Sequence, residues 1–200
     1  MALALALPAC SGDGGREFAR YYDPRGFFTA SLPAADTFTV TSPQSGQDGP
    51  GLLTGVIAQP PAPSSAPRAS LFDLSQTEEA DQTIYQVLAI GTGGFEGLAD
   101  MGLYFLTGDP AIDVQLDETV RIDGSEGRLV VGDVRNAGAA TASVAVGMTL
   151  GEGGTGYLIA AVFPPDDWEA QRLDFFRVLE SFRGNVPPSF ETFPVTGQAS

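Results

Sequence analysis

A cluster of four carboxylates could act as cation ligands: Asp109, Asp113, Asp117 and Glu118 lie within ten residues. Oxygen ligands of this kind suit calcium. The spacing differs from the D-x-D-x-D-G pattern of an EF-hand loop, and Pro110 interrupts any continuous helical face. A solvated acidic connection over 109–119 is therefore our main interpretation, and a weak cation site is the alternative.

The glycine-rich segment 91–97, GTGGFEG, follows a predicted strand and precedes a predicted helix. This is the context in which G-x-G-x-x-G binds the pyrophosphate of a dinucleotide. Here Glu96 stands where the last glycine is required, and its carboxylate would face the pyrophosphate. We interpret the segment as a tight strand-to-helix turn and predict no cofactor.

Histidine and lysine are absent from the chain, and Cys10 is the only cysteine. The lack of histidine excludes Ser-His-Asp and Cys-His nucleophiles and His-ligated metals within this chain. The lack of lysine excludes a Schiff base and a P-loop lysine. A single cysteine excludes an intrachain disulfide. We therefore predict no catalytic residues and no metal site.

The charge balance is strongly acidic, with a net charge of −15 and arginine as the only basic residue type. Such a surface repels nucleic-acid phosphates and anionic lipid headgroups. We expect no nucleic-acid partner. The charge is interpreted mainly as an aid to solubility, with an acidic patch for a basic partner as the alternative.

Four aromatic rings lie within the stretch RYYDPRGFF: Tyr21, Tyr22, Phe27 and Phe28. We expect Phe28 and one tyrosine to lie in the core and the other rings to cover a sheet edge. The alternative is an exposed patch that binds a partner.

The segment LPAC, which ends at Cys10, resembles the lipobox of bacterial lipoprotein signal peptides. Ala9 is the small residue that precedes the cysteine in that motif. The resemblance implies that Cys10 carries a diacylglyceryl group, whose two acyl chains suffice for stable anchoring. Because no positively charged residue precedes Cys10, we expect the charged start of the signal to lie upstream.

The apolar pattern predicts a mainly antiparallel sheet, with short alternating runs separated by turn residues. In 37–42, Phe38 and Val40 alternate with threonines, which predicts one buried face and one hydroxyl-lined face. The last three strands should form a meander. The predicted strands are 26–33, 37–42, 52–58, 70–75, 82–90, 128–135, 140–150 and 155–163.

Two helices are predicted, over 95–108 and 166–182. The second has Asp166 and Glu169 in a capping pattern and an apolar stripe that includes Phe175 and Leu179. The fold class that follows is α+β, an antiparallel β-sheet with about two helices packed on it.

The chain divides into a leader and one domain. Residues 1–10 are the truncated signal segment, 11–19 a flexible tether, 20–184 a single globular domain and 185–200 a loose C-terminal tail. The proline-rich stretch 59–70 is predicted to be a surface loop within the domain.

The domain resembles PsbP-like proteins in three stretches: YYDPRGFFTASLP (21–33), VRIDGSEGRLVVGDV (120–134) and VLESFR (178–183). The resemblance implies an α/β/α sandwich like that of actinobacterial LpqN-type lipoproteins, and a non-catalytic role in binding another protein. We therefore expect an envelope protein anchored through Cys10 to the outer face of the bacterial cell membrane. The alternatives are a binding protein for an apolar ligand or lipid between sheet and helix, and an enzyme of unknown type.

Overall fold

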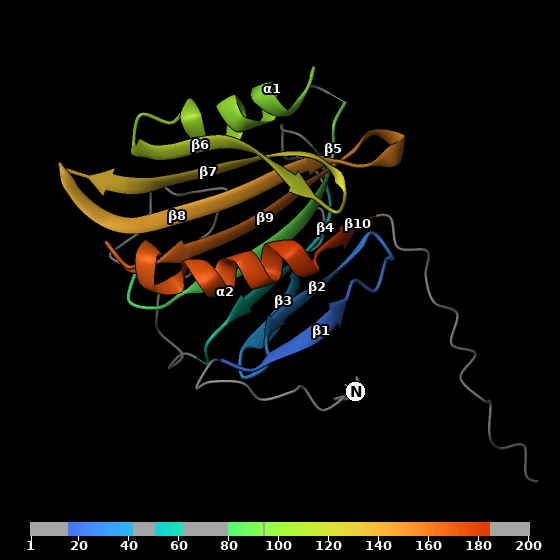
Figure 1. Ribbon diagram of the computed structural model, residues 1–200, viewed down its shortest axis with the longest axis horizontal. Coiled ribbons are helices and arrows are strands. Elements are labelled where there is room, and N and C mark those ends of the chain that lie inside the picture. Colours follow the sequence, from blue (N-terminus) through green and yellow to red (C-terminus); the bar gives the residue numbers. More distant parts are fainter. Residues whose placement is uncertain (1–15, 42–50, 62–79, 94, 185–200) are drawn as a thin grey trace, which may run out of the picture.

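The computed structural model describes residues 16–41, 51–61, 80–93 and 95–184. They form the domain shown in Figure 1. The predicted strand at 70–75, most of the proline-rich loop and the tail 185–200 lie outside the described residues, as does Cys10. Among the described helices, none is both long and apolar enough to cross a lipid bilayer. The elements are β1 (Phe18–Tyr22), β2 (Phe28–Pro33), β3 (Thr37–Thr41), β4 (Leu52–Gln59), β5 (Ile84–Gly91), α1 (Leu98–Gly102), η2 (Leu103–Thr107), β6 (Ile112–Ile122), β7 (Ser125–Asn136), β8 (Ala139–Leu150), η3 (Glu152–Gly154), β9 (Thr155–Phe163), α2 (Trp168–Ser181) and β10 (Arg183–Gly184).

A seven-stranded antiparallel sheet forms the centre of the domain, in the order β3-β4-β5-β9-β8-β7-β6. Its long strands β7, β8 and β9 follow one another in the chain and pair as neighbours, which confirms the predicted meander. The hairpin between β6 and β7 turns at Asp123 and Gly124, which both have positive φ (51° and 78°). Two consecutive residues of this kind suit a two-residue hairpin, because their twist matches that of the flanking strands.

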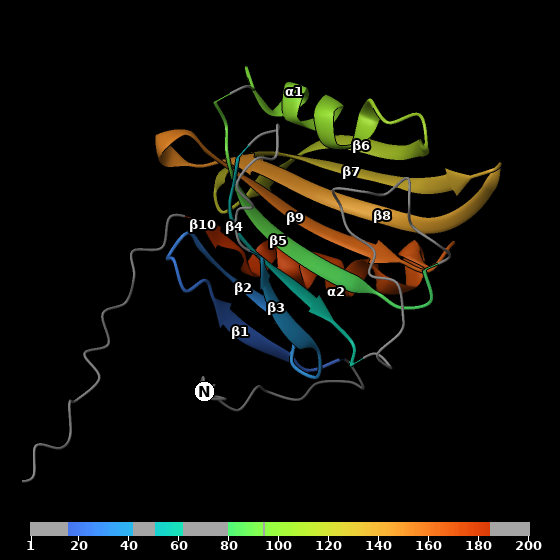
Figure 2. The same ribbon diagram turned by 180° about the vertical axis from the view of Figure 1, so that it is seen from behind.

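One face of the large sheet is covered by α2 and by a second, three-stranded sheet in the order β1-β2-β10. The helix lies in front of the large sheet in Figure 1 and behind it in Figure 2. Its buried side chains include Phe175 and Leu179, as the apolar stripe predicted. Leu179 packs directly over Gly147 of β8, where a Cβ would collide with it. The core on this face therefore depends on aromatic rings from α2 and β2 packing against the small residues of the sheet.

The opposite face of the large sheet is covered by α1 and η2. Met101 of α1 packs against Gly156 of β9. The Met101 methyl carbon lies 3.0 Å from the point that a Cβ on residue 156 would occupy, so a residue larger than glycine would crowd it there. This layer lies along the top of both views, beside β6 and β7 (Figures 1 and 2). The domain is thus an α+β fold with helical layers on both faces of a mostly antiparallel sheet, as predicted.

Three predictions about local structure were wrong. The acidic segment predicted as a connection is mainly the strand β6, whose exposed charges are typical of an edge strand. Phe38 and Val40 of β3 are 38% and 47% exposed rather than buried, because β3 is the opposite edge strand. Asp166 does not cap α2, since it has a positive φ of 62° and the N-cap position falls on Asp167.

The first strand also begins earlier than expected. β1 starts at Phe18, inside the stretch predicted to be a tether, and pairs with β2 from Phe18 to Tyr22. Charged and exposed residues interrupt its apolar pattern, so the sequence offers no clear alternation there.

Candidate interaction surface

The α1–η2 layer presents an apolar pair to solvent, Leu103 and Tyr104, which are 56% and 57% exposed. The next two residues, Phe105 and Leu106, are buried against the sheet. All four residues belong to the π-helical turn η2, which therefore has one side facing solvent and one side against the sheet. Short π-helical turns occur frequently at functional sites.

Neighbouring aromatic rings fix the position of Tyr104. Its ring lies edge-on to Phe105 and Phe95, with centroid separations of 4.9 Å and 5.5 Å. Such edge-to-face pairs stabilise one orientation of the rings. The exposed pair therefore belongs to an ordered aromatic cluster. We call the surface formed by Phe95, Leu98, Leu103 and Tyr104 the helix-layer patch; Phe95 and Leu98 are half-buried in it.

An arginine from the sheet fastens this layer to β7. Arg128 donates from Nη1 to the carbonyl of Ala99 in α1 at 3.1 Å, and two other guanidinium nitrogens donate to Asp117 of β6 at 2.7 Å and 2.6 Å. This hydrogen bonding lowers the pKa of Asp117 and raises that of Arg128. We call the contacts of Arg128 with Ala99 and Asp117 the Arg128 clamp. A Cβ at Gly102 would collide with the Arg128 guanidinium, so a larger residue at position 102 would disrupt this clamp.

The predicted carboxylate cluster is not brought together. Asp117 is bound by Arg128, and Asp113 forms an ion pair with Arg135 at 3.0 Å. Asp109 accepts a hydrogen bond from the backbone of Ala111 at the start of β6. No group of three or more metal-ligating side chains occurs among the described residues.

Carboxylates nevertheless flank the helix-layer patch. Glu96 is exposed before α1, Asp100 is half-buried within it, and Asp109 follows η2. Asp100 also accepts a hydrogen bond from the backbone of Glu96 at 3.3 Å, which orders the entry to the helix. Along the chain, the apolar residues of the patch are thus interspersed with carboxylates and followed by one. This combination suits a partner that offers apolar side chains together with arginine or lysine.

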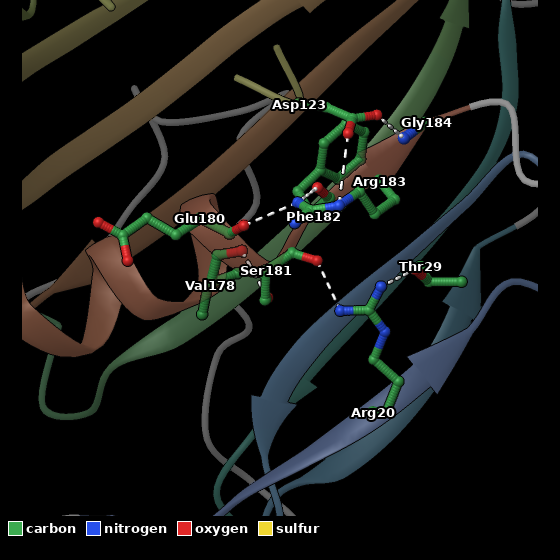
Figure 3. A network of polar contacts seen from close by, with 9 residues as sticks. All are labelled: Arg20, Thr29, Asp123, Val178, Glu180, Ser181, Phe182, Arg183 and Gly184. Carbon is green, nitrogen blue, oxygen red and sulfur yellow. Dashed lines mark hydrogen bonds and ion pairs between the residues drawn. The ribbon is translucent and has the colours of Figure 1, made fainter. Parts of the chain in front are cut away.

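A second group of polar contacts gathers at the C-terminal end of α2 (Figure 3). Asp123, from the β6–β7 turn, accepts a hydrogen bond from Gly184 N at 2.9 Å and pairs with Arg183 Nε at 3.4 Å. Arg20 of β1 donates to Ser181 O at 2.6 Å and to the Thr29 hydroxyl. Arginines at this end of a helix satisfy its last carbonyls and interact favourably with its dipole.

Two open hollows of about 490 Å³ and 410 Å³ flank Asp123. In the larger one, the Thr149 hydroxyl donates to Glu126 O and the Tyr157 hydroxyl donates to Phe27 O. Their lining groups are therefore largely engaged in holding the fold, and the network in Figure 3 is best explained as the junction between the two sheets and α2.

The other predicted site residues fall as follows. Phe28 is fully buried, which confirms its expected place in the core. Tyr21 and Phe27 are half-buried against the core, and Tyr22 is 63% exposed. Burial raises the pKa of Tyr21 to about 12, with a further contribution from Asp23. Of segment 91–97, the described residues 91–93 and 95–97 lie between β5 and α1, and Thr92 N donates to Gly154 O at 2.8 Å.

The helix-layer patch was missed in the sequence, although its residues lie within the predicted helix 95–108. The helical spacing placed Phe95, Leu98, Met101 and Phe105 on one side, and the same spacing puts Leu103 and Tyr104 together on the opposite side. The signal that could have found it is the run LYFL, whose four consecutive apolar residues cannot all face one side of a helix.

Comparisons with known proteins identify the fold. No family model matches the chain, and no curated protein matches it by sequence. The solution structure of cyanobacterial PsbP (CyanoP) from Synechocystis is similar, with 15% identity, a TM-score of 0.56 and coverage of 89% of this chain and 98% of that one. The Ran-binding protein Mog1p of Saccharomyces cerevisiae has 14% identity, a TM-score of 0.50 and coverage of 86% and 97%. LpqN of Mycobacterium tuberculosis, described as involved in cell envelope biogenesis, has 16% identity and a TM-score of 0.45 over 88% and 94% of the two chains, which is too low to support an inference. The fold is therefore PsbP-like.

Proposed function

We propose that this protein is a non-catalytic, lipid-anchored interaction module of the bacterial cell envelope, and that the helix-layer patch binds a basic protein partner. The observation that carries the proposal is the exposed pair Leu103 and Tyr104, ordered by Phe95 and flanked by carboxylates. Aromatic side chains held in place in this way lose little entropy on binding and are enriched at interfaces.

The charge of the chain supports the choice of partner. With a net charge of −15, the protein attracts basic surfaces over several ångströms and repels acidic ones. Arg128, the arginine that holds the patch in place, is paired with Asp117 and so adds little positive potential to it. Mog1p, which has the same fold, is described as Ran-binding, so a fold of this kind is compatible with recognition of a protein partner.

The anchor is supported by the sequence LPAC alone, because Cys10 lies outside the described residues. Only five residues separate Cys10 from Arg16, the first described residue. An extended chain spans at most about 3.5 Å per residue, so an acyl group on Cys10 would hold Arg16 within roughly 20 Å of the membrane. An envelope partner would then be met close to the membrane surface.

The anchor is tested by mass spectrometry of the mature N-terminus together with cell fractionation. We expect Cys10 to be the first residue, with the added mass of a diacylglyceryl group, and the protein to sediment with membranes. Cys10→Ser should release it, whereas Ser11→Ala, the matched control, should leave it bound. An unmodified N-terminus upstream of Cys10 in the cytosol would contradict the proposed location.

The surface is tested with a pair of single substitutions. Leu103→Ser should abolish co-purification of the partner that the wild-type protein retains at low salt. Leu173→Ser is the matched control, since Leu173 is 72% exposed on α2, on the other face of the sheet. Equal loss of the partner with both variants would remove the helix-layer patch from the proposal.

A further inference from the structure

A buried carboxylate at the β2–β3 turn is paired with a residue from the start of the described chain. The Asp36 side chain is 1% exposed, and its Oδ1 accepts a hydrogen bond from Arg16 Nη2 at 2.9 Å. Its Oδ2 is buried and has no hydrogen-bond partner among the described residues. Burial raises the pKa of Asp36, and the charge and hydrogen bond of Arg16 oppose that rise. The buried Asp36 carboxylate therefore needs a cation beside it, and its Oδ2 can still accept a hydrogen bond from that cation.

A buried hydroxyl lies close to this ion pair. Tyr85 of β5 is completely buried, and its hydroxyl makes no well-formed hydrogen bond within the described part of the chain. Burial raises the pKa of Tyr85, as do the charges of Asp174 and Asp36, whereas Arg16 lies close enough to lower it. Arg16 of the N-terminal segment thus lies near two buried polar groups, the Asp36 carboxylate of the β2–β3 turn and the Tyr85 hydroxyl of β5.

The backbone around Arg16 is held at the surface by contacts of its own. Glu17 O accepts a hydrogen bond from Ala34 N at 2.8 Å, and Arg16 O accepts one from Arg177 of α2 at 3.5 Å. The Arg177 guanidinium also lies 5.5 Å from the centre of the Phe18 ring. Residues 16–18 thus form a strap that crosses from the small sheet to α2. Of the strap contacts described above, the ion pair of Arg16 with Asp36 is the one that reaches a buried group.

We propose that Asp36, together with the neighbouring Tyr85 hydroxyl, forms a binding site for a guanidinium group, and that Arg16 is its intramolecular ligand. A guanidinium fits because it is planar, always charged and weakly hydrated, and because its several donors can serve both oxygens of one carboxylate and a hydroxyl together. The site fastens the strap to the domain, and a competing guanidinium can replace Arg16. This site lies apart from the helix-layer patch and does not depend on the proposed function.

Chemical rescue of Arg16→Ala in the full chain tests the site. The substitution removes the guanidinium and leaves the Asp36 carboxylate buried without a cation, so Tm should fall by about 4 °C. Methylguanidinium at about 10 mM should recover at least half of that loss by binding the folded state. Methylammonium at the same concentration should recover far less, and Arg16→Lys should stay below the wild type, because an ammonium group lacks the planar set of donors.

Two controls keep the result interpretable. The wild-type protein, whose site is filled, should not gain from methylguanidinium. The double variant Arg16→Ala/Asp36→Asn should not respond either, because no buried charge remains to be neutralised. An Arg16→Ala protein that melts at the wild-type temperature would overturn the proposal, as would a methylguanidinium effect of equal size on the wild type and on the double variant.

Discussion

The Arg128 clamp, in which Arg128 binds Asp117 of β6 and Ala99 O of α1, should contribute to stability in a way that depends on pH. Asp117→Asn keeps the shape of the side chain but removes the charge that orders Arg128. The structure shows two hydrogen bonds between these residues, at 2.7 Å and 2.6 Å, with the Arg128 and Asp117 side chains 21% and 37% exposed. A hydrogen bond to a charged group contributes about 1.5–3 kcal/mol when buried, and an exposed ion pair about 0.2–1 kcal/mol. For this partly exposed pair we expect a loss of about 1 kcal/mol at neutral pH.

The sign of the pH dependence follows from the lowered pKa of Asp117. The carboxylate releases its proton more readily in the folded state, so its contribution is complete above the unfolded pKa near 3.8. The contribution is lost as the pH falls through the lower folded value. The difference in unfolding free energy between the wild type and Asp117→Asn should therefore be about 1 kcal/mol at neutral pH and close to zero once both states are protonated.

Urea denaturation at a series of pH values measures this difference. With a slope of about 2 kcal/mol per molar urea, a loss of 1 kcal/mol shifts the midpoint by about 0.5 M. The substitution should also increase hydrogen exchange in α1, because the Arg128 bond to Ala99 O loses its orientation. A difference that persists undiminished at the lowest pH would refute the reasoning, because it could not come from the charge of Asp117.

Three further predictions test the packing. Phe182→Ala should lower the unfolding free energy by about 3–5 kcal/mol, because the ring is fully buried against Tyr157, whereas Leu173→Ala on exposed α2 should change it by less than about 0.5 kcal/mol in the same denaturation assay. Tyr157→Phe should lower the free energy of unfolding by about 1 kcal/mol, because it removes the hydrogen bond to Phe27 O. Tyr21→Phe should leave it unchanged or raise it, since the Tyr21 hydroxyl is buried and unpaired within the described residues. Equal losses in the two variants would contradict this. Gly102→Ala should lower Tm as Arg128→Ala does, and the double variant should lose less than the sum; strict additivity would exclude the collision with Arg128.

The elements that could be predicted are those whose burial follows a simple rule. β8 and β9 are central strands buried on both faces, and their long apolar runs between glycine-rich turns identify them. The helix α2 has one buried face and a recognisable apolar stripe. In these segments, local propensity and tertiary burial favour the same structure.

The edges of the sheet could not be predicted in the same way. β6 is exposed along most of its length, so charged residues replace the alternation that marks a half-buried strand. β3 has the alternation, but its position at the other edge leaves Phe38 and Val40 partly exposed. Whether a strand lies at an edge is decided by the whole topology, and charges within the strand are only an indirect sign of it.

The candidate sites depend on contacts between distant residues. Arg16 and Asp36 are 20 residues apart, and Asp117 and Arg128 are paired across two strands of which only β7 was predicted. Leu103 and Tyr104 lie opposite the helix face that the 3.6-residue spacing marks as buried, but spacing alone does not show that the rest of the domain leaves that side uncovered. The role of Cys10 stays a prediction, since it rests on the sequence motif.

The proposed interaction surface is tested most directly by site-specific photo-crosslinking in membranes of the source cells. A photoreactive residue at position 104 should give one dominant protein adduct whose yield falls as salt is raised, because the carboxylates around the patch attract a basic partner. The same residue at position 173 should give no such adduct. A dominant adduct at position 173 but not at 104, or a yield at 104 that salt does not change, would contradict the account.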